Sequence, residues 1–250
     1  MRALGDQGES CVNSDPSEVL SKARKAYQDK DYPVALENYQ WFYHNALDID
    51  QSYYGVRLSY CLGEWADLGK EFPEATDALV QLKEKALAEF SSTKSRTAFH
   101  EYSSICEYLE CKEEVYVLFL TVHNSDNTLA EKLFTFVYEY CASNEMWDLC
   151  REYLGNGYNK YKQSLETFDH MMEFAEEKPG ELGESIYRDA VIAIKRETLW
   201  ILNMLNFINA PGEYESAISK IESDLKERGH ESIYEEILAI APNNQRQPTQ

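Results

Sequence analysis

Apolar residues recur at spacings of three and four along most of the chain, which is the period of a helix that buries one face. The clearest instance is 52–90, where two such patterns stand on either side of a turn. The apolar positions of the first pattern are Leu58, Cys61, Leu62, Trp65 and Leu68, and those of the second are Ala75, Leu79, Leu82 and Ala86. Between them, we expect Gly69 to end the first helix in a left-handed conformation and Pro73 to open the second. This stretch therefore predicts an αα-hairpin that needs neighbours to cover its apolar face.

The same periodicity predicts helices on both sides of this hairpin. Asp15 and Pro16 form a strong start signal, because Asp15 can cap a helix and proline fits the first helical position. Further helices are expected after Tyr32-Pro33, from Ser91-Ser92-Thr93, after a cap at Asn127 or Thr128, and over 158–177, 186–208, 214–228 and 233–240. The run 115–120 has the composition of a strand. We expect a buried helix there instead, because a lone strand in a helical chain would have no pairing partner.

Together these signals predict an all-α chain, an α-solenoid of antiparallel helix pairs. We expect the repeat domain to span 15–241. A flexible tail over 1–14 and a disordered tail over 242–250 are expected to flank it, because both are polar and poor in apolar residues.

Two hairpins match one another at a shift of about 40 residues, which lies within the range of helical repeats. Asp31-Tyr32-Pro33-x-Ala35 corresponds to Glu71-Phe72-Pro73-x-Ala75. Each has an acid, an aromatic residue that anchors the turn, a proline that starts a helix and an alanine that allows close approach.

These residues resemble the tetratricopeptide repeat (TPR) family. Leu62-Gly63, Phe72, Ala75 and Leu79 match that family's pattern, and Ala23, Tyr32, Ala35 and Tyr39 match it less fully. The resemblance implies a right-handed superhelix of antiparallel helix pairs whose concave face binds a protein or peptide. It places these residues on that face: Arg24, Tyr27, Gln28, Tyr60, Glu64, Asp67, Thr135 and Glu139. The Lys/Asn clamp with which some members hold a C-terminal carboxylate is missing, and acids beside tyrosines favour a basic or neutral peptide.

Charge and cysteine usage narrow the class of partner and the compartment. Asp and Glu number 44 against 24 Lys and Arg, a net charge of -20 that opposes binding to nucleic acid and to anionic lipid. The 6 cysteines form no Cys-x-x-Cys pair and fall mostly on apolar helix faces. They are typical of buried free thiols in a reducing compartment, so we expect a cytoplasmic protein without a membrane span.

The sequence does not favour catalysis, a metal site or a cofactor. Glu227-x-x-His230 is the one histidine spacing typical of a metal ligand pair, and a di-iron bundle needs two such motifs. Glu166 and His170 are one helical turn apart, which more often indicates a surface pair. The first hypothesis is a non-enzymatic scaffold or adaptor that binds a protein or peptide segment. The alternative is a peptide or small-ligand sensing module that acts through a partner protein, and a self-associating structural protein is a third hypothesis, with the oligomeric state left open.

Overall fold

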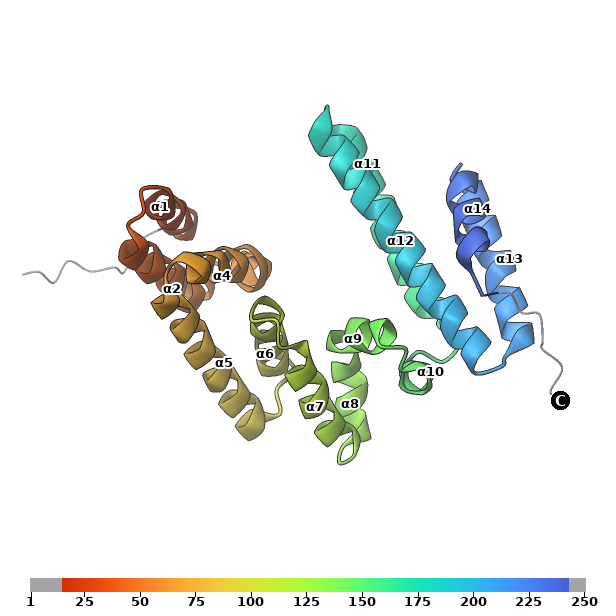
Figure 1. Cartoon of the computed structure of the whole chain (residues 1–250), viewed down its shortest axis with the longest axis horizontal. Coiled ribbons are helices and arrows are strands. Elements are labelled where there is room, and N and C mark those ends of the chain that lie inside the picture. The colour runs from red at the N-terminus through yellow and green to blue at the C-terminus, as the bar shows by residue number, and fades with distance from the viewer. Residues whose placement is uncertain (1–14, 243–250) are drawn as a thin grey trace, which may run out of the picture. The chain divides into compact units, whose positions relative to one another are not determined.

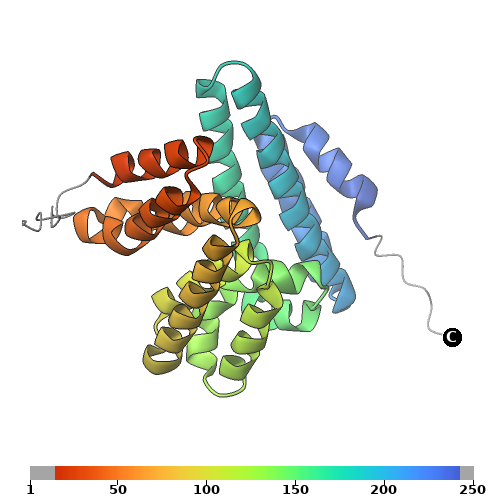
Figure 2. The same cartoon turned by 60° about the vertical axis from the view of Figure 1, so that its left-hand side comes forward.

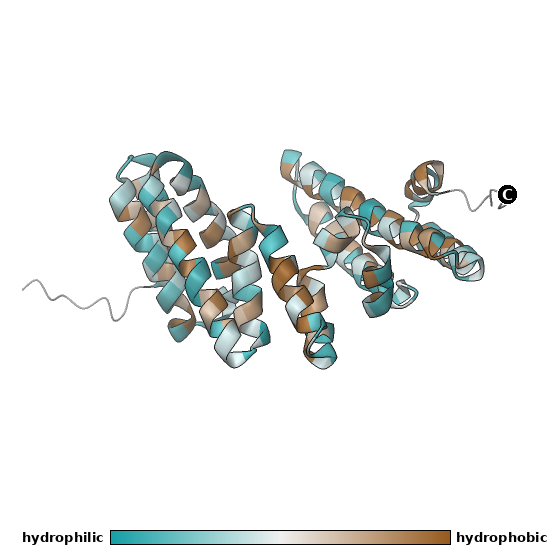
Figure 3. Cartoon of the chain, turned by 60° about the horizontal axis from the view of Figure 1, so that its bottom comes forward, coloured by the Kyte–Doolittle hydropathy of each residue, from teal (hydrophilic) through white to brown (hydrophobic). Residues whose placement is uncertain are grey.

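The computed structural model describes residues 15–242, and these residues form helices and turns without a strand (Figure 1). The all-α class predicted from the sequence is confirmed. The chain divides between Phe136 and Val137 into two compact units, and each is described by itself. In Figure 3, hydrophilic and hydrophobic residues share the same helices, as amphipathic helices require.

The first unit is built from successive helices that fold back on one another (Figures 1 and 2). Its helices are α1 (Pro16–Gln28), α2 (Tyr32–Ile49), α3 (Tyr54–Val56), α4 (Leu62–Glu71), α5 (Pro73–Thr93), α6 (Arg96–Tyr108), α7 (Lys112–His123) and α8 (Asn127–Leu133). The π-helical turn Arg57–Cys61 joins α3 to α4. Apart from packing on the next helix in the chain, α4 packs against α2 and α6, and α6 packs against α8.

The hairpin predicted around 52–90 is confirmed as α4 and α5, with one correction at the turn. Gly69 is not a left-handed cap, because α4 continues to Glu71 and Phe72 is its C-cap. The glycine instead allows close approach of the two helices: a Cβ atom at Gly69 would lie 2.4 Å from the Thr76 Oγ1 atom. Pro73 opens α5 as predicted.

Two predicted helix starts are wrong by a few residues. Ser91-Ser92-Thr93 forms the last turn of α5, where the Ser91 hydroxyl donates to the Leu87 carbonyl at 2.7 Å. The helix ends at Lys94 in the left-handed region, and Ser95 caps α6. At α8 the cap is Asp126, whose carboxylate accepts from the backbone N–H of Leu129 at 3.0 Å, and not Asn127 or Thr128.

The 40-residue spacing of the first two hairpins extends to a third in the pattern of burial. Ala35, Ala75 and Val115 are all buried, and so are Tyr39, Leu79 and Phe119. The rings of Tyr32 and Phe72, one spacing apart, lie 6.2 Å from each other. The third copy could not be recognised from the sequence, because Lys112 stands where the first two copies have an aromatic residue.

The run 115–120 lies within α7, so the prediction of a helix there is confirmed. It is only partly buried, however, because Val117 faces solvent with 57% of its surface exposed. The run is continuously apolar because α7 carries hydrophobic residues on its exposed side as well as on its packed face.

The second unit is organised around its longest helix. Its helices are α9 (Tyr138–Ser143), α10 (Trp147–Leu154), α11 (Tyr158–Glu177), α12 (Glu181–Phe207), α13 (Pro211–Glu227) and α14 (Glu231–Ile240). α12 packs against α10, α11, α13 and α14. The predicted breaks are confirmed, with Gly157, Gly180 and Gly229 in the left-handed region at φ of 74°, 70° and 76°. α12 begins five residues earlier than the predicted start at 186, directly after Gly180.

The predicted thiols are free where the structure describes them: Cys61, Cys106, Cys141 and Cys150 are buried and Cys111 is half-buried. Cys11 and the tails expected at 1–14 and 243–250 lie outside the described residues. Pro242, the first residue of the expected C-terminal tail, accepts a hydrogen bond from the Tyr214 hydroxyl through its carbonyl. Within 15–242, no helix combines the length and the apolar character that a membrane crossing requires.

Candidate functional site

Two of the predicted site residues pair with each other between α1 and α4. The Arg24 Nε atom donates to both oxygens of Glu64 at 2.9 and 3.0 Å. The two residues are one 40-residue spacing apart, so they occupy equivalent positions of adjacent hairpins. This hydrogen bond raises the pKa of Arg24. The pair links the two hairpins and leaves both side chains partly exposed.

The other predicted residues on α1 and α4 and in the turn before α4 have different contacts and different exposure to solvent. The Tyr27 ring lies 6.0 Å from that of Tyr32, so it belongs to the aromatic contacts at the turns. Gln28 is exposed at the last position of α1, and Tyr60 is 65% exposed. Asp67 accepts a hydrogen bond from the Lys70 ammonium at 2.7 Å.

The last two predicted residues belong to different units. Thr135 is exposed in the short helical turn Phe134–Phe136, at the end of the first unit. Glu139 lies on α9 in the second unit, where Arg196 pairs with its carboxylate at 3.2 Å.

A groove of about 450 Å³ lies beside α4, α5 and the end of α6. Its polar lining consists of Asp67, Lys70, Thr76, Glu107, Tyr108 and Glu110, and we call it the acidic groove. Small residues of α4 shape it: a Cβ atom at Gly63 would lie 3.1 Å from the Tyr108 ring, so the glycine lets that ring approach. Of the eight predicted residues, Asp67 alone lines this groove.

Negative charge exceeds positive charge along the acidic groove. Asp67 is paired with Lys70, and Glu107 is paired with Lys112 at 2.9 Å. Within the described part of the chain, no cation lies within ion-pair distance of Glu110. The sequence reasoning missed Glu107, Tyr108 and Glu110, because a helix C-terminus brings them to α4 through the fold. No repeat spacing indicates them, since Tyr108 stands 45 positions after Gly63 and so falls outside the 40-residue register.

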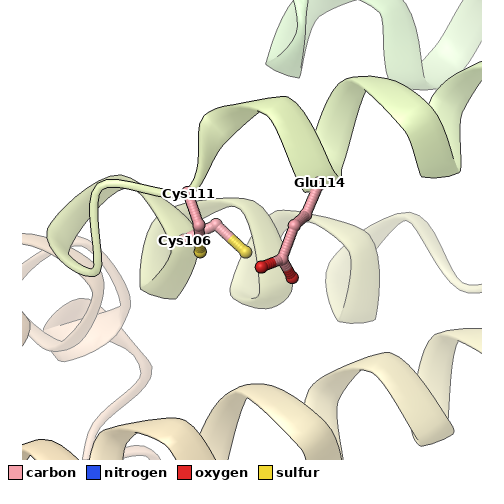
Figure 4. Close-up of side chains that lie close together, drawn as sticks. All are labelled: Cys106, Cys111 and Glu114. Atoms are coloured by element: carbon pink, nitrogen blue, oxygen red, sulfur yellow. The ribbon is translucent and has the colours of Figure 1, made fainter.

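Two thiols and a carboxylate meet at the turn between α6 and α7 (Figure 4). The Sγ atoms of Cys106 and Cys111 and a carboxylate oxygen of Glu114 all lie within 4.8 Å of one another. The Lys83 ammonium, from α5, donates to the two Glu114 oxygens at 3.0 and 2.8 Å and lies 3.8 Å from the Cys111 Sγ atom. The hydrogen bond from Lys83 lowers the pKa of Glu114, and burial raises the pKa of the Cys106 thiol. Among residues 15–242, Cys106, Cys111 and Glu114 form the one cluster of three potential ligands close enough together to hold a metal ion.

The second unit contains a smaller cavity of about 250 Å³ beside α11, α12 and α13. Tyr158, Tyr161 and Ile201 line it, and the Lys220 ammonium, also in the lining, lies 4.1 Å from the centre of the Tyr158 ring. Tyr161 is 2% exposed, and its hydroxyl is buried without a hydrogen-bond partner in the described structure. A buried hydroxyl that lacks a partner costs the folded state free energy.

No protein-family model matches the chain, and no curated protein or solved structure matches it either. The assignment of function therefore rests on the geometry of these sites.

Proposed function

We propose that residues 15–136 form a TPR-like interaction module that binds a basic segment of a partner protein in the acidic groove. The observation that carries this proposal is the groove of about 450 Å³ with an excess of carboxylates over cations. Its volume is within the range of pockets that hold small ligands or a few side chains, about 300–1,000 Å³. A non-enzymatic scaffold or adaptor would act through such a contact.

The charges favour a basic occupant over an acidic or neutral one. Glu110 offers a carboxylate without an ion pair, and Asp67 and Glu107 can each exchange an exposed lysine for a ligand cation. Exposed ion pairs contribute at most about 1 kcal/mol, so this exchange costs little. Tyr108 offers an aromatic face beside the carboxylates, and such faces attract Lys and Arg.

The stacking of equivalent positions supports the TPR-like part of the proposal. The Arg24–Glu64 pair and the Tyr32–Phe72 contact both join residues 40 positions apart. A superhelix of repeats brings equivalent positions of neighbours together in this way.

A peptide array tests the proposal with Lys/Arg-rich, neutral and Asp/Glu-rich sequences of matched length. We expect the full chain to retain the basic peptides and to lose them as salt is raised. Glu110→Lys should weaken binding at least about tenfold, or about 1.4 kcal/mol. Glu89→Gln, which removes an exposed acid of α5 outside the groove, should leave binding unchanged. Equal binding by the two variants, or a preference for acidic peptides, would contradict the proposal.

The cavity of the second unit favours a second function, a sensor of a small ligand. Its tyrosine lining and the Lys220 ammonium suit a compact molecule with an apolar body and one acidic group. A panel of aromatic and carboxylate metabolites can be tested by thermal unfolding, because a ligand of the folded state raises the melting temperature. We expect Lys220→Met to remove most of the rise caused by an acidic ligand that binds here. A rise of equal size in both proteins would exclude this cavity.

A further inference from the structure

The turn between α6 and α7 holds two thiols and a carboxylate in a fixed arrangement. Cys106 lies in the last turn of α6, and its carbonyl accepts a hydrogen bond from the Cys111 N–H at 2.8 Å. Glu110, in the left-handed region at φ 56°, reverses the chain between them. Cys111 occupies the N-cap position of α7, and Glu114 follows it by three residues on the first turn of that helix. The backbone therefore brings these side chains together without help from a ligand.

We propose that Cys106, Cys111 and Glu114 bind a divalent cation that prefers thiolate ligands, with Zn²⁺ as the expected ion. In tetrahedral Zn²⁺ sites the ion lies about 2.3 Å from sulfur and about 2.0–2.2 Å from oxygen, so ligand atoms stand about 3.5–3.8 Å apart. The ligand atoms here lie within 4.8 Å of one another. A contraction of about 1 Å through side-chain rotation brings them to a common ion.

The choice of a thiolate-preferring cation follows from the ligand atoms. Two sulfurs and one carboxylate oxygen suit Zn²⁺, whereas Mg²⁺ and Ca²⁺ prefer oxygen alone. The fourth position is open to water, because Cys111 is half-buried and the Glu114 side chain is 49% exposed.

The charges of the site balance when the ion binds. The cation forms bonds to two sulfurs and one carboxylate oxygen, and the two thiol protons pass to solvent. Two thiolates and one carboxylate then face the dication and the Lys83 ammonium, so the sum is zero. Lys83 can stay in place, because it contacts both Glu114 oxygens and the ion needs one of them. Tyr102, from α6, also donates to the Glu114 carboxylate, at 3.3 Å, and helps to orient it.

A bound ion would brace the turn that carries part of the acidic groove. Leu109 and Glu110 line the groove and directly precede Cys111. The metal site is nevertheless a separate proposal, since it can be tested without any peptide.

Co²⁺ replaces Zn²⁺ in tetrahedral sites and reports its ligands by absorption. The full chain is stripped with a chelator, kept under a phosphine reductant, and its 6 thiols are counted before the titration. We expect one equivalent of Co²⁺ to give strong visible ligand-field bands and a thiolate-to-cobalt charge-transfer band. Zn²⁺ should then abolish both, and a pH indicator should record the release of protons.

Variants assign the bands to the three residues. Cys111→Ser should remove most of the charge-transfer intensity and weaken binding at least about hundredfold, and Glu114→Gln should weaken it about tenfold. Both side chains are partly exposed, so these variants should keep the helical circular dichroism of the parent. Cys141→Ala, which removes a buried thiol of the second unit, should bind Co²⁺ as the parent does. Only weak octahedral bands in the parent, or unchanged bands in Cys111→Ser, would overturn the proposal.

Discussion

Loss of either partner of the buried Arg57–Glu101 ion pair should strongly destabilise the first unit. The Arg57 side chain is 7% exposed and that of Glu101 is 20% exposed. The guanidinium lies 4.4 Å from the centre of the Tyr43 ring, and the Tyr43 hydroxyl donates to Glu101 at 3.4 Å. The Arg57 Nε atom has no hydrogen-bond partner in the described structure, so Glu101 is the main source of compensation for the buried charge.

The loss of one partner should therefore cost far more than a surface ion pair. Breaking a buried pair typically costs about 3–5 kcal/mol, because the remaining charge stays buried without compensation. We expect about 3 kcal/mol for Glu101→Leu, because the carboxylate is one-fifth exposed. Arg57→Met should cost a similar amount. The double variant should lie within about 1 kcal/mol of the parent, since packed apolar residues can replace such a pair.

Urea unfolding followed by circular dichroism measures these differences. With a slope of about 2 kcal/mol per molar urea, a loss of 3 kcal/mol lowers the midpoint by about 1.5 M. Hydrogen exchange in α4 and α6 shows whether the first unit is the part that loses stability. Single variants that cost under about 1 kcal/mol, or a double variant equal to the sum of the singles, would refute the reasoning.

Two further substitutions should change stability in opposite directions. Glu197, 7% exposed on α12, has its pKa raised by burial and accepts a hydrogen bond from the Tyr138 hydroxyl. When the pKa of a carboxyl group is raised in the folded state, the protein loses stability as pH rises from the unfolded-state pKa through the folded-state pKa. Glu197→Gln should therefore stabilise the chain at pH 7 and reduce the dependence of its melting temperature on pH above about pH 4.5. A pH series of thermal melts measures this, and parallel curves for parent and variant would argue against it. Gly69→Ala should cost about 1–3 kcal/mol, because its Cβ atom would lie 2.4 Å from Thr76 Oγ1, and Thr76→Ala in the same chain should restore most of that loss in urea titrations.

Local signals explain why most helices could be predicted from the sequence. The apolar period gave α11 to the residue and α13 to within three residues, because Gly157, Pro211 and Gly229 stand at their ends. Gly69 shows where such signals fail. A glycine serves either a positive φ or a close approach between helices, and only the position of Thr76 decides between them.

The candidate sites depended more on contacts that no local pattern encodes. The TPR resemblance placed Asp67 on a concave face, and in the structure Asp67 lines the acidic groove. Glu110 enters the same groove from a turn that the sequence presents only as the end of a helix. The cluster of Cys106, Cys111 and Glu114 has no familiar metal-binding spacing, because the reversal at Glu110 sets its geometry.

In the proposed stack of repeats, the 40-residue spacing separates charges that pair within the stack from charges that we propose face the ligand. When repeats stack, a side chain meets its own equivalent in the next hairpin, so opposite charges at equivalent positions neutralise each other. Arg24 and Glu64 follow this rule, and the energy of their exposed pair is small. Glu110 has Lys70 at the equivalent position, and Lys70 is held by Asp67, three residues away on its own helix. Lys70 therefore reaches Glu110 through its charge and without an ion pair, so binding should depend on Glu110 more than on Glu64, whose carboxylate holds Arg24.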